Sequence, residues 1–243
     1  MKKRGLRRTH RYPVQIGYKC CGRGLKEHPP FGGNINYSEM NFLRESWLRQ
    51  DTDTREEAMM NSVQGKGATE YRVLLTRSFR ECRRVLKDDG WMTVMFHNSS
   101  REVWTALQTA IGDAGFAIRG TQTFDKEHGT FKQFVSENAV GYDLVLHCRK
   151  TEQAVTHRTD DICFPLDVAE FVRQRVAQNP ERYCVHYLHV ARADEWDFRK
   201  MHAEWLAETL PENGALIGFE EFRHYAESVV AGLELKPMQS LLL

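Results

Sequence analysis

Residues 69–97 read TEYRVLLTRSFRECRRVLKDDGWMTVMFH, and this stretch decides the fold class. Apolar residues recur at helical spacing from residue 69 to residue 87, which predicts an amphipathic helix. The turn formed by Asp88, Asp89 and Gly90 ends that helix. Residues 91–97 favour β structure and are apolar nearly throughout, as expected for a strand that is covered on both faces. A helix that leads into a buried strand predicts an α/β sheet.

The segments that follow repeat this alternation. Residues 100–113 are predicted to form a helix, and residues 116–124 alternate in polarity as a strand does. Residues 142–149 are predicted to form a further strand, which could pair antiparallel with the one before it. The polar, glycine-bearing stretch of residues 126–139 lies between these two strands, and its length favours a functional loop.

Two helices are predicted upstream. Residues 38–49 begin with Ser38, a good N-cap, and place Phe42, Leu43 and Trp47 on one face. A shorter helix is expected over residues 54–63.

The pattern becomes helical after residue 150. A polar linker covers residues 151–161, and three helices are then predicted, over residues 165–178, 195–210 and 219–233. The chain therefore divides into three parts, which are a basic segment (1–27), an α/β domain (28–150) and a helical region (151–243) that we expect to pack on the sheet or to recognise a ligand.

Composition places the chain among globular proteins of the reducing cytoplasm. It has 243 residues, of which 41% are hydrophobic. The sequence contains no apolar run of about 20 residues and no secretory signal, so neither a membrane span nor export is expected. Its six cysteines lack paired spacing, and the adjacent Cys20 and Cys21 do not make a four-ligand set, so we predict no metal site.

Charge is distributed unevenly although the formal net charge is only +1. Residues 1–27 carry nine lysine and arginine residues against one acidic residue, Glu27. A basic arm of this kind can follow the phosphates of a nucleic acid, and the alternative is a solvated tail without a partner.

The stretch His28-Pro29-Pro30-Phe31-Gly32-Gly33-Asn34 is the strongest candidate site. Two successive prolines fix two φ angles and remove two backbone donors. An aromatic residue and two conformationally permissive glycines follow. A rigid turn that presents an aromatic ring and free carbonyl oxygens is suited to holding a flat base that carries an amine.

This loop resembles the Asp-Pro-Pro-Tyr/Phe motif of DNA methyltransferases that modify the exocyclic amine of adenine or cytosine. The resemblance extends in order through residues 28–150. Further segments similar to that family, or to S-adenosylmethionine-dependent methyltransferases in general, are residues 37–43, 84–90, 96–100, 129–133 and 138–140.

The resemblance implies a partial class I, Rossmann-like methyltransferase sheet with the strand order 3-2-1-4-5-7-6. Residues 91–97, 116–124 and 142–149 would then be the fifth, sixth and seventh strands. S-adenosylmethionine is the implied cofactor and would lie over the first strands. DNA is the implied partner.

Two parts of the family pattern are missing from the sequence. Residues 20–27 are polar and basic, so we expect no strand before the Pro-Pro loop, and no glycine-rich cofactor turn is found. The fifth strand would then be an open edge, which invites pairing. Either a second polypeptide completes the sheet or the chain is a degenerate remnant.

The resemblance also implies roles for the loop residues. The target base must be flipped out of the duplex, and its amine hydrogens need acceptors. In the family these acceptors are the acidic side chain and the first proline's carbonyl, which here correspond to His28 and Pro29. Pro30 completes the turn, and Phe31 would stack on the base, its alternative being a core aromatic. Neutral imidazole accepts one hydrogen bond, whereas a protonated ring accepts none.

Other polar residues are candidates for binding. Asn34 and Tyr37 are predicted to contact the cofactor or the base, although Asn34 is equally suited to form a turn. His97 and Asn98 follow a strand at the usual ligand edge of an α/β sheet and are predicted to bind DNA, and capping of the next helix is the alternative. Phosphate contacts are predicted for residues in the long loop, against the alternative of simple solvation: Lys126, Lys132 and Gln133.

Three functional hypotheses follow. The first is a site-specific DNA methyltransferase that transfers a methyl group from S-adenosylmethionine to the exocyclic amine of adenine or cytosine, and that is either truncated or dependent on a partner for its cofactor half. The second is a non-catalytic nucleic-acid-binding or adaptor protein. The third is a degenerate remnant.

Overall fold

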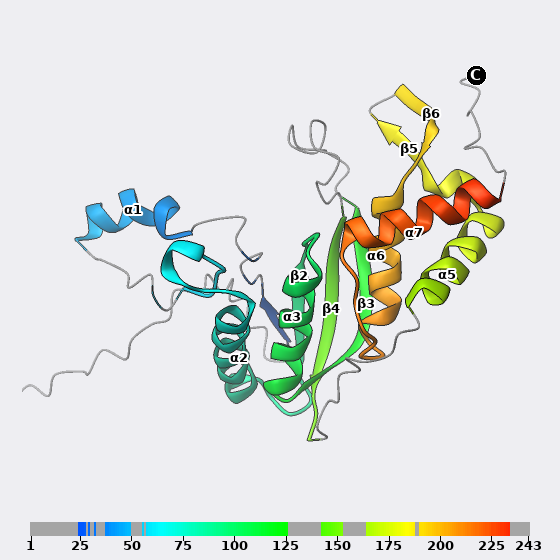
Figure 1. The fold of residues 1–243 in the computed structure, drawn as a ribbon. Coiled ribbons are helices and arrows are strands. Elements are labelled where there is room, and N and C mark those ends of the chain that lie inside the picture. Colours follow the sequence, from blue (N-terminus) through cyan, green and yellow to red (C-terminus); the bar gives the residue numbers. More distant parts are fainter. Residues whose placement is uncertain are drawn as a thin grey trace, which may run out of the picture.

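The computed structural model describes residues 24–27, 29, 32, 37–49, 55, 57–125, 142–152, 164–187 and 190–233. Within these residues the chain has an α/β architecture, with a mixed four-stranded sheet, a separate two-stranded sheet and six α-helices (Figure 1). The α/β class predicted from residues 69–97 is therefore confirmed. No helix in this described part is long and apolar enough to cross a membrane.

The main sheet has the strand order β1-β2-β4-β3. Its strands are β1 (Gly24–Glu27), β2 (Trp91–Phe96), β3 (Phe116–Asp125) and β4 (Tyr142–Lys150). β1 runs parallel to β2, whereas β4 is antiparallel to both β2 and β3, so β3 runs in the same direction as β2. The three strands predicted after residue 90 are therefore present, and the predicted antiparallel pairing of the last two is confirmed.

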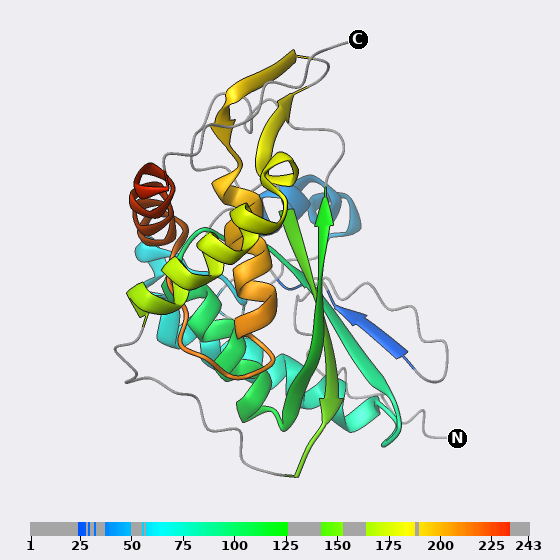
Figure 2. The same cartoon turned by 90° about the vertical axis from the view of Figure 1, so that its right-hand side faces the viewer.

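The expectation that no strand precedes the Pro-Pro loop is wrong. Gly24 to Glu27 pair residue by residue with Trp91 to Val94, and Figure 2 shows β1 (blue) at the edge of the sheet. The polar and basic composition of this segment argued against a buried strand. However, a short edge strand needs few apolar side chains, and Leu25, which is 2% exposed, supplies one. β2 is therefore not an open edge, and in the described residues the edge strands of this sheet are β1 and β3.

Two helices that alternate with the strands cover one face of the sheet. α2 (Ala68–Val85) follows the predicted periodicity and buries Tyr71, Leu75 and Phe79. α3 (Arg101–Asp113) buries Trp104, whose ring meets Phe96 of β2 edge-on at 5.0 Å between centroids. We call this the covered face.

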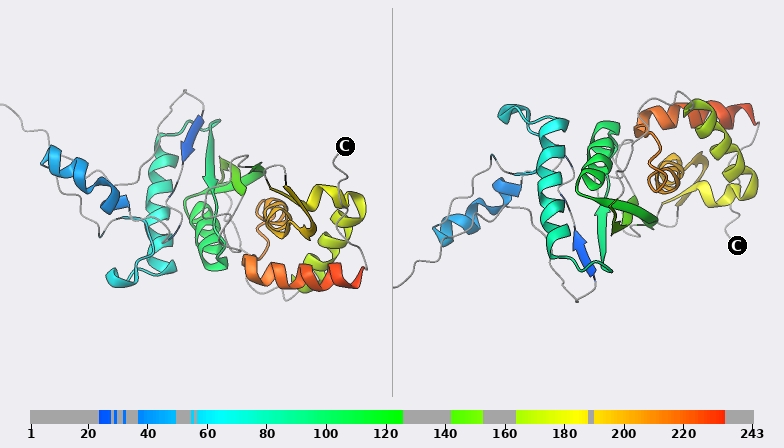
Figure 3. Two further views of the ribbon diagram at one scale, coloured as in Figure 1. Left: turned by 90° about the horizontal axis from the view of Figure 1, so that it is seen from above. Right: turned by 90° about the horizontal axis from the view of Figure 1, so that it is seen from below.

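The opposite face, which we call the open face, is not lined by a helix of the described residues (Figure 3). Along β2 the side chains of Met92, Val94 and Phe96 are fully buried, whereas those between them are partly exposed. Trp91 is 40% exposed on the open face. The side chains of β2 are fully buried on one face only, although the strand is apolar nearly throughout. The prediction that β2 is covered on both faces is therefore wrong for the described structure.

The segment before α2 differs in part from its prediction. α1 (Tyr37–Leu48) forms where a helix was expected, but Phe42, Leu43 and Trp47 on its predicted apolar face are exposed. The helix predicted over residues 54–63 is wrong for residues 57–61, which are described and not helical. A 3₁₀ turn, η2 (Ser62–Gln64), follows them, and the Asn61 side chain accepts the backbone N–H of Val63 at 3.0 Å.

The region after residue 163 packs against the same core. Its helices are α5 (Phe164–Gln178), α6 (Phe198–Thr209) and α7 (Phe219–Gly232), close to the three predicted ones. A hairpin of β5 (Cys184–Tyr187) and β6 (Val190–Trp196) follows the turn η3 (Pro180–Tyr183), so the prediction of a purely helical region was incomplete.

α6 lies beside α3 on the covered face, against β3 and β4 (Figure 3). The backbone N–H of Phe219 donates to the carbonyl of Ser99 at 2.9 Å, and Gln108 Nε2 donates to the carbonyl of Gly214 at 3.3 Å. The buried apolar side chains of the sheet and of these helices form one continuous cluster. The C-terminal region therefore packs on the sheet, as expected.

Candidate functional site

The candidate site lies where the parallel strands β1 and β2 end. Because both strands run in the same direction, the loops that follow them lie at one edge of the sheet. Pro29 is buried directly after β1. Gly32 has φ of +74° and lies against the segment after β2. A methyl group on its Cα would lie 3.2 Å from Val103 Cγ2 and 3.4 Å from Asn98 Nδ2, so Gly32 and Asn98 lie close together.

Asn98 has a structural role at this edge. Its side chain is 6% exposed, and its Oδ1 accepts the backbone N–H of Ser100 at 2.7 Å. Its carbonyl oxygen accepts the indole N–H of Trp104 at 2.8 Å. Asn98 thus forms a turn before Ser100, the N-cap of α3, and binds Trp104 of that helix, whereas α3 has no side-chain cap. Its contact with DNA stays a prediction.

His97 is paired with a residue that the sequence reading did not select. Its Nδ1 lies 2.7 Å from Oδ1 of Asp143, which is at the start of β4. The pairing follows from register, because Phe96 is opposite Leu144, so the next residue of β2 faces the one before Leu144. The Asp143 side chain is 8% exposed and that of His97 is 23% exposed. A buried carboxylate needs such a partner because removing it from water is costly.

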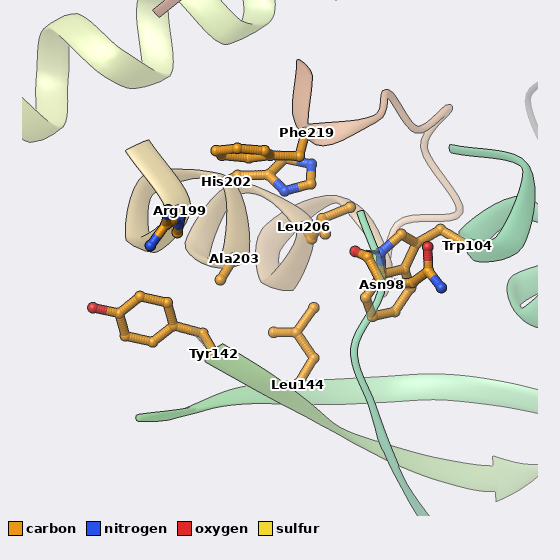
Figure 4. Close-up of a pocket in the computed structure, with 9 residues that line it drawn as sticks. All are labelled: Asn98, Trp104, Tyr142, Leu144, Arg199, His202, Ala203, Leu206 and Phe219. Atoms are coloured by element: carbon orange, nitrogen blue, oxygen red, sulfur yellow. Dashed lines mark hydrogen bonds between the residues drawn. The ribbon is translucent and has the colours of Figure 1, made fainter. Parts of the chain in front are cut away.

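A small cavity lies next to the site, between β4 and α6. Figure 4 shows Tyr142 and Leu144 on the strand side and Arg199 and His202 on the helix side. The cavity measures about 10 Å³, which is room for roughly one water molecule. At its rim the Tyr142 hydroxyl donates to Asp197 Oδ2 at 2.6 Å. This cavity is too small to hold a nucleobase or a cofactor.

His202 belongs to the packing of the C-terminal helices. Its Nε2 lies 3.2 Å from the carbonyl oxygen of Ile217, so this nitrogen carries the hydrogen. The ring stacks with Trp205 at 6.2 Å between centroids and contacts Phe219 and Phe222. Burial lowers the pKa of His202 to about 4, and its hydrogen bond to Ile217 opposes that shift. His202 is therefore neutral near pH 7.

The structure describes only part of the predicted site. Pro29, His97 and Asn98 lie at the same sheet edge. Tyr37 begins α1, and its side chain is not described. The remaining candidates lie outside the described residues: His28, Pro30, Phe31, Asn34, Lys126, Lys132 and Gln133.

Asp143 and Gly32 are the site residues that sequence reasoning missed. The signal for Asp143 was its place at the start of a predicted strand. Pairing that strand with residues 91–97 in the correct register would have set it opposite His97. Gly32 was noted for its conformational freedom, but its contact with Asn98 depends on the fold.

The described residues do not fit the implied cofactor. They contain neither a glycine-rich turn nor the strands over which the resemblance places S-adenosylmethionine, and the cavity beside the site admits about one water molecule. In these residues no three His, Cys, Asp or Glu side chains converge as metal ligands.

Neither models of protein families nor curated proteins gave a match to this chain.

Proposed function

We propose that this chain is the base-binding half of a DNA methyltransferase that acts on the exocyclic amine of adenine or cytosine. A second polypeptide would supply the half that holds S-adenosylmethionine. One observation carries the proposal, which is the sheet order β1-β2-β4-β3 with β4 antiparallel to its neighbours. This corresponds to the strands 4-5-7-6 of the order that the resemblance implies, with β1 directly before the Pro-Pro loop.

The edge of the sheet at β1 and the open face both support the proposal that a second half is required. The connection from β1 through α2 to β2 places its helix on the covered face. Right-handed crossovers that proceed in the other direction, away from β1, place their helices on the opposite face. A segment that adds parallel strands to β1 would therefore also cover the open face, where Trp91 is 40% exposed.

The two described residues of the Pro-Pro loop support the proposal. Pro29 follows β1 at the carboxyl edge of the sheet, and Gly32 lies against Asn98 and Val103. A prolyl residue has no N–H, so the loop offers carbonyl oxygens without competing donors at Pro29 and Pro30. His28 occupies the position where the family has an acid, and a neutral imidazole is a weaker acceptor than a carboxylate.

A complementation assay tests this proposal. The second half is taken from a family member whose helix reads Tyr-Ser-Glu-x-Asn-Phe-Leu, cut before the strand that leads into its acidic Pro-Pro motif. Methyl incorporation from labelled S-adenosylmethionine into DNA is measured for each half and for the mixture. We expect incorporation only in the mixture, increased by about tenfold or more with His28→Asp because a carboxylate accepts more strongly, and removed by Phe31→Ala. A mixture that does not bind the methyl donor in calorimetry would contradict the proposal.

A non-catalytic nucleic-acid-binding protein is the second candidate, favoured by the basic residues 1–27. DNA binding that weakens steeply with salt, survives Phe31→Ala and is lost when residues 1–27 are deleted would favour it. Absence of DNA binding at low salt would remove it. For the remnant hypothesis, a cooperative thermal unfolding transition of the chain alone would count against it.

A further inference from the structure

The helix α1 carries apolar side chains that no other described element covers. Four large ones are between 67% and 90% exposed: Phe42, Leu43, Trp47 and Leu48. Single exposed apolar side chains are ordinary on a protein surface, whereas four of them within one helix of 12 residues form a patch of the kind that marks an interaction site. We call these four residues the α1 patch.

The length of α1 adds to the need for a covering surface. Helices of about 12–15 residues or fewer are marginal in water when nothing packs on them, and α1 has 12 residues. None of the other described helices or strands makes an extensive contact with α1, and Figure 1 shows it apart from them. The surface that stabilises this helix therefore lies outside the described part of the chain.

The charges of α1 point to a protein as its partner. The helix contains one basic residue, Arg44, against two acidic ones, Glu39 and Glu45. A helix that lies on an anionic lipid surface has an excess of lysine and arginine on its polar face, and a helix that follows nucleic-acid phosphates has one too. An apolar patch without that excess is suited to an apolar groove of a folded protein.

The size of the α1 patch indicates that it forms only part of an interface. A buried aromatic side chain removes about 150–250 Å² from water, so Phe42 and Trp47 would contribute roughly 300 Å² at their present exposure. The two leucine side chains are smaller and add less. The total stays below the roughly 800 Å² that each partner buries in a stable interface of standard size. A contact between the α1 patches of two copies is therefore too small, and the partner of α1 also contacts another surface of the chain.

The position of α1 connects the patch to the β1 edge of the main sheet. Residues 28–36 join β1 to α1, and even a fully extended connection of this length spans about 35 Å at most. Figures 1 and 3 show α1 at the end of the molecule where β1 lies, with α5, α6 and α7 at the other end. A polypeptide that adds strands to β1 therefore comes within reach of α1.

We propose that the α1 patch docks into an apolar groove of the polypeptide that supplies the cofactor half, with Trp47 as its main contact. This rests on the proposed function, because it takes that second half as the partner. The second half then contacts the chain at β1, on the open face and at α1, and together these surfaces supply the area that the patch alone lacks. The connection that contains the Pro-Pro motif is thereby anchored at both of its ends.

Binding of the second half used in the complementation assay is the first test. Calorimetry measures its affinity for the full chain, for Trp47→Ala and for Phe124→Ala. Because alanine favours a helix and Trp47 is 90% exposed, Trp47→Ala should leave the unfolding free energy of the chain unchanged. It should weaken binding about thirtyfold, as loss of an interface hot spot would. Phe124→Ala is the matched control, since this exposed aromatic residue lies on β3 at the opposite edge of the sheet, and it should leave the affinity unchanged.

Amide hydrogen exchange in α1 is the second test. A short helix without packing opens readily, so the amides of Tyr37–Leu48 should exchange rapidly in the chain alone and at least tenfold more slowly in the mixture. If the second half bound but α1 exchange or the affinity of Trp47→Ala stayed unchanged, the inference would be overturned and the proposed function would stand. Absence of any binding would overturn both. Dimerisation of the chain alone, lost with Trp47→Ala in light scattering, would assign the patch to a second copy and overturn the inference.

Discussion

The two faces of the main sheet differ in how far their side chains are buried. On the covered face, Met92, Val94 and Leu146 have no measurable exposure and pack beneath helices. On the open face, Trp91 is 40% exposed, and its ring is covered by the Arg149 guanidinium at 5.0 Å from the centroid. One face of this sheet is therefore buried and the other is partly exposed to solvent, which leaves the exposed face accessible to the second half that we propose.

The same contrast runs along the sheet from edge to edge. At the β3–β4 side, α6 and the segment up to α7 complete the packing, with the Thr121 hydroxyl donating to the carbonyl of Ala207. At the β1 side, the last strand has four residues, against ten in β3 at the opposite edge. The second half that we propose belongs at this side, and the following substitutions test the contrast.

The largest difference is expected between two tryptophans. Trp104 on the covered side is 1% exposed and Trp91 on the open side is 40% exposed. Trp104→Ala creates a cavity and removes the bond to Asn98, so it should lower the free energy of unfolding by about 4 kcal/mol. Trp91→Ala should cost about 1 kcal/mol or less. Denaturant unfolding of both variants checks this, and equal losses would refute the contrast between the faces.

Acid should weaken the covered side through His202. Because its pKa is about 4 in the folded chain and near 6.5 when unfolded, the unfolded chain binds more protons between these pH values. Stability should therefore fall as pH is lowered from 6.5 to 4, by about 3 kcal/mol in total. His202→Gln keeps a donor for Ile217 without titrating, and denaturant unfolding as a function of pH should show a flatter profile for it. An unchanged profile would contradict the assignment.

A side chain in place of Gly32 should destabilise the folded chain. Gly32→Ala meets both a positive φ of +74° and the contact with Val103, so it should cost about 2 kcal/mol in unfolding free energy. Gly65→Ala is the matched control, since its φ is +64° and no atom lies within 4 Å of the added Cβ. That substitution should cost about 1 kcal/mol. If the control were as costly as Gly32→Ala, the loop would not be packed against α3.

The smallest effect on stability is expected on the open face itself. Met95 is partly exposed in β2, so Met95→Glu should change the unfolding free energy by less than about 1 kcal/mol. It should nevertheless weaken binding of the second half at least tenfold in calorimetry, because a charge would be buried there. If Met95→Glu left the affinity for the second half unchanged, the partner would bind elsewhere.

Periodicity and turn signals predicted most of the helices and three of the four main strands. They failed for β1, because the stability of a four-residue edge strand depends on backbone pairing with β2 and on Leu25 rather than on its own composition. They also missed the β5–β6 hairpin.

The candidate site was less predictable than the fold. His97 and Asn98 were predicted as site residues from their place after a strand, but their different contacts were not predicted. Asn98 bonds Ser100 and Trp104 at the start of α3, whereas His97 meets Asp143, and this difference depends on the alternation of faces and on the register of β4. Pairing between residues 46 positions apart depends on tertiary structure and leaves no local signal.

The incompleteness of the sheet is the central claim, and amide hydrogen–deuterium exchange in β1 tests it most directly. Exchange at Gly24–Glu27 is measured in the chain alone and after addition of the second half. We predict that the free-edge amides of β1 exchange rapidly in the chain alone and become at least tenfold slower in the mixture, because a parallel strand pairs with them. Unchanged exchange in β1, with the second half bound, would contradict the account.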